Sequence, residues 1–219
     1  MKRLLGIVAV VATLGLLTAG VAQGQGTPSG GAEAKVKRGG VVRTRIHASI
    51  KHLDPVVTGH GAYAFTLFPM LSNLVKHDPL DPKGIRIVAD LAESWKVSDS
   101  GETVEFKLRN GLKWSDGKPL TAEDVKFTFD IIRNPPGKYV SARKGLWASI
   151  KTIETPDPRT IRFILHAPSA SFLSNVAWGW TKIMPKHTWE DDGGWRKNKV
   201  GSGPFIIQHD WQPSMATWT

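Results

Sequence analysis

The chain has 219 residues, of which 41% are hydrophobic and 22% charged, and this ordinary globular composition argues against a disordered or fibrous protein. It contains no cysteine, which excludes disulfide scaffolds, cysteine-ligated zinc, thiol catalysis and a lipid-modified cysteine. The formal net charge is +10, but basic residues are interspersed with acidic ones and form no long run. This distribution indicates a solvated basic surface and argues against nucleic-acid binding.

The N-terminus has the pattern of an export signal. Two basic residues precede an uncharged apolar run over residues 4–17, and small residues then lead to Ala22. We expect cleavage near Ala22, so that residues 1–22 form a signal peptide; the alternative is a retained membrane anchor. Residues 23–37 begin with Gly, Gln, Ser, Thr and Pro, a composition typical of a flexible linker.

The first elements expected in the mature chain are a strand and a buried helix. Residues 41–46 are β-branched for the most part and follow a Gly-Gly breaker, which predicts a strand. Residues 62–75 are apolar enough for a buried helix. Its large apolar residues at helical spacings are Phe65, Phe68, Leu71 and Leu74.

The most regular pattern begins with a hairpin. Residues 103–109 alternate strictly, which places Val104, Phe106 and Leu108 on the core face of a strand that pairs with residues 95–97. A later strand is predicted in the same way from the alternation of Ile161, Phe163 and Leu165. Strands separated by single helices make this an α/β chain with at least one antiparallel hairpin.

A capped helix follows the hairpin. Thr121 and Asp124 have the spacing of a capping box, and the helix that begins there stops at Asn134-Pro135-Pro136. One face of this helix carries Val125, Phe129 and Ile132. The sequence therefore predicts a helix that packs on the sheet.

No pattern of catalytic or metal-binding residues stands out, so we expect no enzyme, no metal and no cofactor. Hydrolase G-x-S-x-G and phosphate-binding G-x-x-x-x-G-K-[ST] motifs are absent. Residues 59–64 match the G-x-G-x-x-A form of a dinucleotide loop, but Asp54-Pro55 leaves no room for the strand that should precede it. The four histidines between residues 47 and 77 lack metal-site spacing and are interpreted as surface residues.

Tryptophan is unusually frequent, with nine residues against two tyrosines. Such rings supply large rigid apolar area and one donor each, and core packing is the default interpretation for any one of them. Trp178-Gly179-Trp180 lies between two structured segments and is the pair we least expect in the core.

Two blocks carry a resemblance to a known family. Residues 91–95 read LAESW, and residues 106–125 read FKLRNGLKWSDGKPLTAEDV. Three shorter pieces agree in order: the Gly39-Gly40 strand, Leu53-Asp54-Pro55 and Gly201-Ser202-Gly203-Pro204-Phe205. Together they resemble family 5 of the bacterial extracellular solute-binding proteins, the dipeptide, oligopeptide and nickel receptors of ABC importers. One difference is Ser202, where the family has Thr in G-T-G-P-[FY].

The resemblance implies the fold. Residues 38–207 are similar to the first lobe of a type II-like periplasmic binding protein, with a mixed sheet, flanking helices and an antiparallel subdomain. Family chains are considerably longer, so we expect an incomplete N-terminal lobe, a truncated tail over 208–219 and no second lobe. The hairpin, turn and capped helix are features that build the fold, so we expect structural and not ligand-binding roles for Asp116, Gly117, Thr121 and Asp124.

The resemblance also implies the function: a periplasmic or extracytoplasmic receptor that binds a small peptide without chemistry. It would hand the peptide to a membrane permease and its ATPase, touching the membrane only through that permease. Alternatives are a receptor for nickel, an opine or an oligosaccharide, or a membrane-anchored interaction protein if the apolar N-terminus is retained.

Ligand-facing segments of the family correspond to residues 47–50, 139–147 and 178–182. The candidate ligand-binding residues are His47, Ser49, Ile50, Tyr139, Arg143, Trp147, Trp178, Trp180 and Lys182. Among the basic residues, Arg143, Lys144 and Lys182 are the candidates for pairing with a ligand carboxylate, because a buried unpaired charge is costly.

Overall fold

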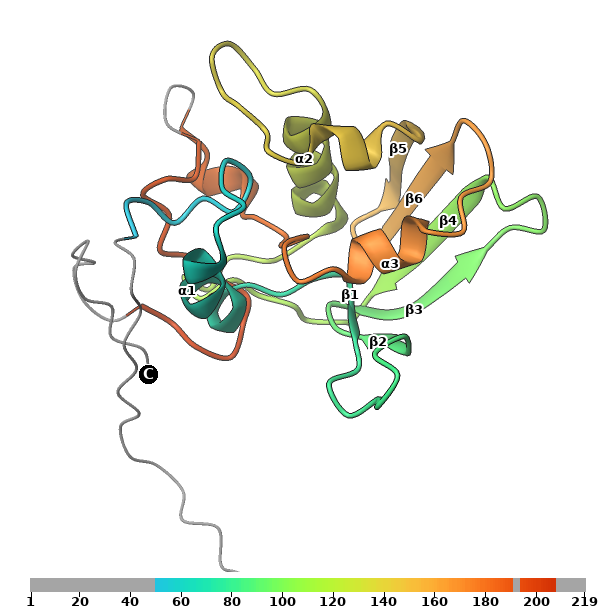
Figure 1. Cartoon of the computed structure of the whole chain (residues 1–219), viewed down its shortest axis with the longest axis horizontal. Helices are drawn as coiled ribbons and strands as arrows, with labels where there is room; N and C mark the ends of the chain where they lie inside the picture. The colour runs from blue at the N-terminus through green and yellow to red at the C-terminus, as the bar shows by residue number, and fades with distance from the viewer. Residues whose placement is uncertain (1–49, 191–193, 208–219) are drawn as a thin grey trace, which may run out of the picture. The chain divides into compact units, whose positions relative to one another are not determined.

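The computed structural model describes residues 50–190 and 194–207, shown in Figure 1. The expected signal peptide, linker and first strand, the candidates His47 and Ser49, and the expected tail over 208–219 lie outside these residues. The helical elements are η1 (Gly61–Tyr63), α1 (Ala64–Met70), α2 (Ala122–Arg133), η2 (Lys144–Trp147), α3 (Phe172–Ala177) and η3 (Lys186–Thr188). The strands are β1 (Val75–His77), β2 (Ile87–Ala89), β3 (Ala92–Val97), β4 (Thr103–Leu108), β5 (Ile150–Asp157) and β6 (Thr160–Leu165).

A four-stranded antiparallel sheet of order β3-β4-β6-β5 is the main sheet of the described residues, and β1 and β2 form a separate antiparallel pair. The predicted hairpin is confirmed as β3–β4, with Val104, Phe106 and Leu108 buried. The antiparallel part of the expected architecture is thus present. Both sheets are purely antiparallel, so the expected mixed sheet does not occur in the described residues.

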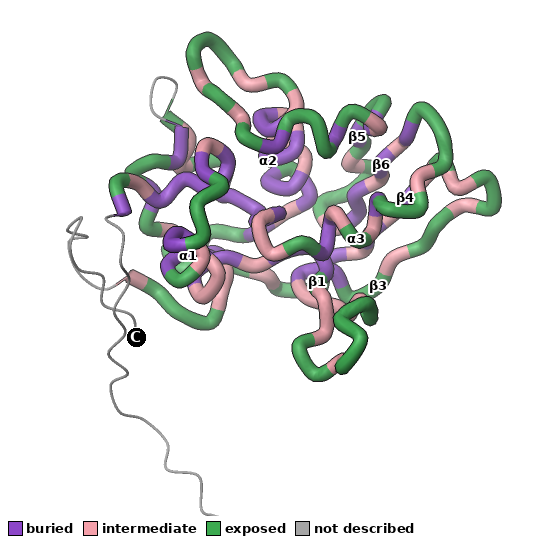
Figure 2. Tube along the Cα trace, in the orientation of Figure 1, coloured by how far each residue is buried: buried purple, intermediate pink, exposed green. Residues whose placement is uncertain are grey.

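Helix α2 packs on strands β5 and β6 of this sheet, and much of α2 has the colour of buried residues in Figure 2. Val125, Phe129 and Ile132 are buried as predicted, and the Phe129 ring meets Phe163 of β6 edge to face at 4.8 Å. Aromatic pairs of this geometry stabilise a core beyond their apolar area. The helix ends at Arg133, just before the two prolines.

The residues expected to be structural hold the start of α2. The Thr121 backbone N–H donates to Asp124 Oδ2 at 2.9 Å, and Asp124 Oδ1 accepts from the Lys186 N–H at 2.9 Å. Asp116 Oδ2 lies 2.7 Å from His187 Nε2, and Gly117 has φ 86°, a conformation that favours glycine. The predicted capping box of Thr121 and Asp124 is confirmed.

The predicted helix over 62–75 is wrong in extent, because α1 ends at Met70. Continued helix would bond the carbonyls of Pro69 and Met70 to the N–H groups of residues 73 and 74. Instead these carbonyls accept from Phe205 N at 3.2 Å and Gly203 N at 2.8 Å. Phe65, expected on the buried face, is 66% exposed.

The Gly201–Phe205 element contacts α1 and does not join either sheet. A Cβ on Gly203 would lie 2.4 Å from Pro69 O, and one on Gly201 would lie 2.2 Å from Met70 O. Only glycine lets the two backbones approach this closely. The Gly-Ser-Gly-Pro-Phe segment therefore packs its backbone directly against the backbone at the end of α1.

The sequence did not predict β5, nor did it predict β1, β2 and α3. Strand β5 shows why. Its register shifts twice against β6, between Ile150 and Thr152 and between Glu154 and Asp157, and Pro156 lies within it. These irregularities break the alternation by which strands are recognised in a sequence. Within the described residues, no helix is long and apolar enough to cross a membrane.

Candidate ligand-binding site

Four of the candidate residues lie together around a ring that the sequence did not single out as a ligand contact, Phe68 of α1. The Arg143 guanidinium lies over Trp180 at 5.2 Å from the ring centroid and over Trp178 at 6.0 Å. Trp180 meets Phe68 edge to face at 5.4 Å, and Lys182 Nζ lies 4.6 Å from the Phe68 centroid. We call these five residues, Phe68, Arg143, Trp178, Trp180 and Lys182, the aromatic–cation cluster.

The Trp178–Lys182 segment is held by its backbone. Asn73 Nδ2 donates to Trp178 O at 2.7 Å, and the Thr181 N–H donates to the same oxygen at 2.8 Å. A Cβ on Gly179 would lie 2.6 Å from the Phe68 ring, so the turn between the two tryptophans passes closely over that ring. The chain thereby leaves Trp178 43% exposed while it keeps Trp180 half-buried.

Arg143 is a buried cation, 7% exposed. Its Nη1 donates to Thr58 O at 2.7 Å, which is the one hydrogen bond of the guanidinium within the described part of the chain. Burial lowers the pKa of the Arg143 guanidinium, and the charges of Asp54 and Tyr139 oppose that shift. A guanidinium has five N–H donors, so Arg143 can donate further hydrogen bonds to a ligand.

Lys182 is likewise 7% exposed, and within residues 50–190 and 194–207 its ammonium has no hydrogen-bond acceptor or ion pair. Burial lowers the pKa of Lys182 to about 8, with Asp90 raising it and Lys76 lowering it further. Burying a cation without an anion is costly, and the face of Phe68 compensates only part of that cost. The buried ammonium of Lys182 therefore carries a desolvation cost that no described side chain offsets with a negative charge in an ion pair.

Tyr139 belongs to a neighbouring polar network. Its hydroxyl donates to Asp54 Oδ2, and the same carboxylate accepts from Trp195 N at 3.0 Å and Val56 N at 2.8 Å. Burial and the Asp54 charge hold the pKa of the Tyr139 hydroxyl far above its ordinary value. This places Tyr139 as a support for the loop that carries Arg143.

Like Tyr139, the candidates Trp147 and Ile50 lie outside the aromatic–cation cluster. Trp147 is 1% exposed and packs edge to face on Phe129 at 4.8 Å and on Phe172 at 6.1 Å. Ile50 is 3% exposed in the same hydrophobic core. The described residues also contain no group of three or more His, Asp or Glu side chains that could hold a metal ion.

Phe68 is the contact that sequence reasoning missed. It was expected on the face of a long buried helix, and nothing in the apolar run 62–75 distinguishes it from its neighbours. The sequence feature that could have indicated this contact is Gly179, since a glycine between two tryptophans indicates a close approach to another side chain.

Comparisons with known proteins place most of the described residues in one family. The model of the family described as bacterial extracellular solute-binding proteins, family 5 Middle, matches residues 86–218, more than half of the chain. A Brucella ovis protein with the provisional name of an ABC transporter peptide-binding protein is 39% identical over 135 residues, 57% of this chain and 24% of that protein. A probable D,D-dipeptide-binding periplasmic protein of Escherichia coli K12 is 34% identical over 168 residues, 73% of this chain and 31% of that protein.

One similar solved structure is a periplasmic binding protein of Agrobacterium tumefaciens R10 in complex with mannopinic acid. It is 31% identical with a TM-score of 0.69, over 78% of this chain and 35% of that one. The expected α/β fold of the type II periplasmic binding-protein kind is thereby confirmed. The chain spans about a quarter to a third of the length of the curated relatives it matches. It belongs to the bacterial extracellular solute-binding proteins, family 5.

Proposed function

We propose that this chain contributes to the extracytoplasmic substrate-binding component of an ABC importer, which binds peptides and delivers them to a membrane permease and its ATPase. Membership of family 5 supports the role in solute binding, and the names of the Brucella and Escherichia relatives support peptides as the ligand class. Export through the signal at residues 1–22 belongs to the same proposal.

The observation that carries the ligand chemistry is the pair of buried cations on one set of aromatic rings. Arg143 and Lys182 are each 7% exposed and have no carboxylate partner within the described residues. In this role they would pair with the C-terminal carboxylate of a peptide, whose negative charge compensates their desolvation. Trp178 and Trp180 would supply a rigid apolar wall beside the peptide backbone.

An opine is the second candidate ligand, because the Agrobacterium relative is recorded in complex with mannopinic acid. Opines carry carboxylates, so the same two cations would serve. The two candidates differ in what they require of the rest of the site: a peptide series tolerates varied side chains, whereas an opine requires its sugar-derived portion.

Calorimetric titration of the protein purified from its host separates these candidates. We expect saturable binding of a mixed di- and oligopeptide series and at least tenfold weaker binding of the same peptides with amidated C-termini. Saturable binding of mannopinic acid with no response to any peptide would replace the peptide assignment by the opine one. No binding of any carboxylate ligand would contradict both.

A further inference from the structure

A separate depression lies where the end of α2, η2, the start of β5 and the residue after β6 meet. Its volume is about 530 Å³, and it shares no lining residue with the aromatic–cation cluster. We call it the Trp147 pocket; its lining residues are Arg133, Lys144, Gly145, Trp147, Ala148, Ile150 and His166. Helix α2 and the main sheet hold these segments in place, because Arg133 donates to Ile150 O at 2.6 Å and His166 N donates to Ser149 O at 2.9 Å.

A buried donor without a partner marks this pocket. Trp147 is 1% exposed, yet its indole Nε1 makes no hydrogen bond within the described residues. The described side-chain atoms that are fully enclosed and unpartnered are His77 Nδ1, Trp114 Nε1 and Ser141 Oγ, so Trp147 Nε1 keeps some access to solvent. Trp147 is also one of the residues that line the pocket. An N–H group in this position favours an acceptor atom, because leaving it unpaired costs free energy.

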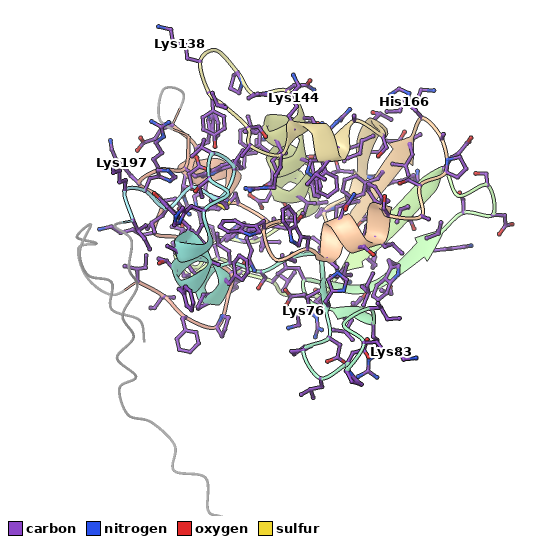
Figure 3. The ribbon with its side chains drawn as sticks, in the orientation of Figure 1. Lys76, Lys83, Lys138, Lys144, His166 and Lys197 are labelled. Carbon is purple, nitrogen blue, oxygen red and sulfur yellow. The ribbon has the colours of Figure 1, made fainter. Side chains whose placement is uncertain are left out.

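The charge around the pocket has one sign. Basic side chains come from Arg133, Lys144 and His166, and no acidic residue lines the pocket. Arg133 is partly compensated by Asp130 at 3.7 Å, but Lys144 and His166 have no ion pair within residues 50–190 and 194–207. Figure 3 shows both of these side chains along the same edge of the molecule, above α2 and the β5–β6 pair. A concave site lined by arginine and lysine side chains concentrates anions.

We propose that the Trp147 pocket binds a small oxyanion-bearing molecule, independently of the ligand of the aromatic–cation cluster. One carboxylate or phosphate oxygen accepts from the Trp147 indole N–H, and Lys144 supplies the main compensating charge. The size of the pocket suits an organic anion better than a single inorganic ion, since it lies within the range of small-molecule sites.

The test follows the indole N–H resonances of the protein by two-dimensional nitrogen–proton NMR during titration with citrate and, separately, with inorganic phosphate. Ionic strength is held constant with sodium chloride. Trp147→Phe assigns the Trp147 resonance and keeps the ring while it removes the donor. Trp114→Phe is the matched control, because that indole is also unpartnered but fully enclosed. Lys144→Gln is paired with Lys138→Gln, which removes an exposed lysine from the neighbouring loop (Figure 3).

We expect a saturable shift of the Trp147 indole resonance and at least a tenfold weaker affinity in Lys144→Gln, about 1.4 kcal/mol. Lys138→Gln and Trp114→Phe should bind as the unmodified protein does. A response to citrate alone identifies a carboxylate ligand, and a response to phosphate alone identifies a phosphate ligand. No saturable shift with either anion would overturn the proposal, as would equal weakening in Lys144→Gln and Lys138→Gln, since that indicates general charge screening.

Discussion

Charged side chains are exposed and paired on the main sheet, whereas in the aromatic–cation cluster they are buried and form no ion pair with described residues. On the outer face of the sheet, Arg162 pairs with Glu105 at 2.8 Å and with Glu154 at 3.1 Å, across three strands and in contact with solvent. In the cluster, Arg143 and Lys182 are buried, and no described acidic side chain forms an ion pair with them. The exposed ion pairs of the sheet cost little desolvation, whereas the two buried cations of the cluster carry a desolvation cost without an ion pair.

The largest change in the free energy of unfolding should follow from damage to the core beneath the main sheet. Phe163 is fully buried and contacts Phe106, Phe129 and Phe172. Phe163→Ala should lower the free energy of unfolding by about 3–5 kcal/mol, because it removes apolar contacts and leaves a cavity. Chemical denaturation measures this. A loss below about 1 kcal/mol would show that the aromatic core is not what holds the sheet to α2.

The opposite sign is expected at Lys182. Lys182→Met keeps the length of the side chain and removes the buried charge, so the ligand-free protein should become more stable by up to about 3 kcal/mol at pH 7. The same change should weaken binding of a carboxylate ligand at least tenfold. Lys138→Met, on an exposed loop, is the matched control and should change neither quantity. Destabilisation by Lys182→Met would mean that the ammonium is paired in the free protein.

The pH dependence of the free energy of unfolding also tests whether the Lys182 ammonium is desolvated. The pKa of Lys182 is about 8 in the folded protein against an ordinary value of 10.5. Below pH 8 both states hold the proton and the folded state bears the full cost of the buried charge. Between pH 8 and 10.5 the unfolded chain binds more protons, so the folded state gains stability relative to it as pH rises.

Denaturation curves of the unmodified protein and Lys182→Met across this range isolate the contribution of Lys182. The stability advantage of Lys182→Met should shrink from pH 8 to 10.5, while the affinity of the unmodified protein for a carboxylate ligand falls as the ammonium loses its proton. A constant stability difference across that range would place the pKa of Lys182 near its ordinary value and count against a desolvated cation.

The smallest effect on stability is expected at the exposed ring of the cluster. Trp178 is 43% exposed, so Trp178→Ala should cost less than about 1 kcal/mol of unfolding free energy while it weakens ligand binding about tenfold. Thermal denaturation and calorimetric titration of the same preparation give both numbers. If the ligand-free protein loses as much free energy as the complex does, Trp178 is a core residue.

Elements with strict local patterns could be predicted from the sequence. The alternation through Val104, Phe106 and Leu108 and the capping pair Thr121 and Asp124 depend on neighbours within a few residues, and both are confirmed. The end of α1 could not be predicted, because Gly203, far along the chain, captures the Met70 carbonyl. In each case the distance in sequence between a residue and its partner decides the outcome.

The candidate site likewise contains residues whose placement could be predicted from the local sequence and residues whose placement could not. Trp178 was expected outside the core because Trp178-Gly179-Trp180 lies between two structured segments, and its exposure agrees with that. Trp147 gave no such signal, and its ring is buried because η2 lies against α2, which brings it onto Phe129. Phe68 entered the cluster through a helix whose exposed and buried faces the sequence did not resolve.

The central claim is that Lys182 is held without an anion in order to receive the carboxylate of a ligand. A double-mutant cycle tests it most directly: calorimetric affinities of one peptide and of its C-terminal amide, each for the unmodified protein and for Lys182→Met. The account predicts that amidation weakens binding at least tenfold in the unmodified protein and clearly less in Lys182→Met, where Arg143 alone can still pair with the carboxylate. An equal loss on amidation in both proteins would show that the carboxylate binds elsewhere and would contradict the claim.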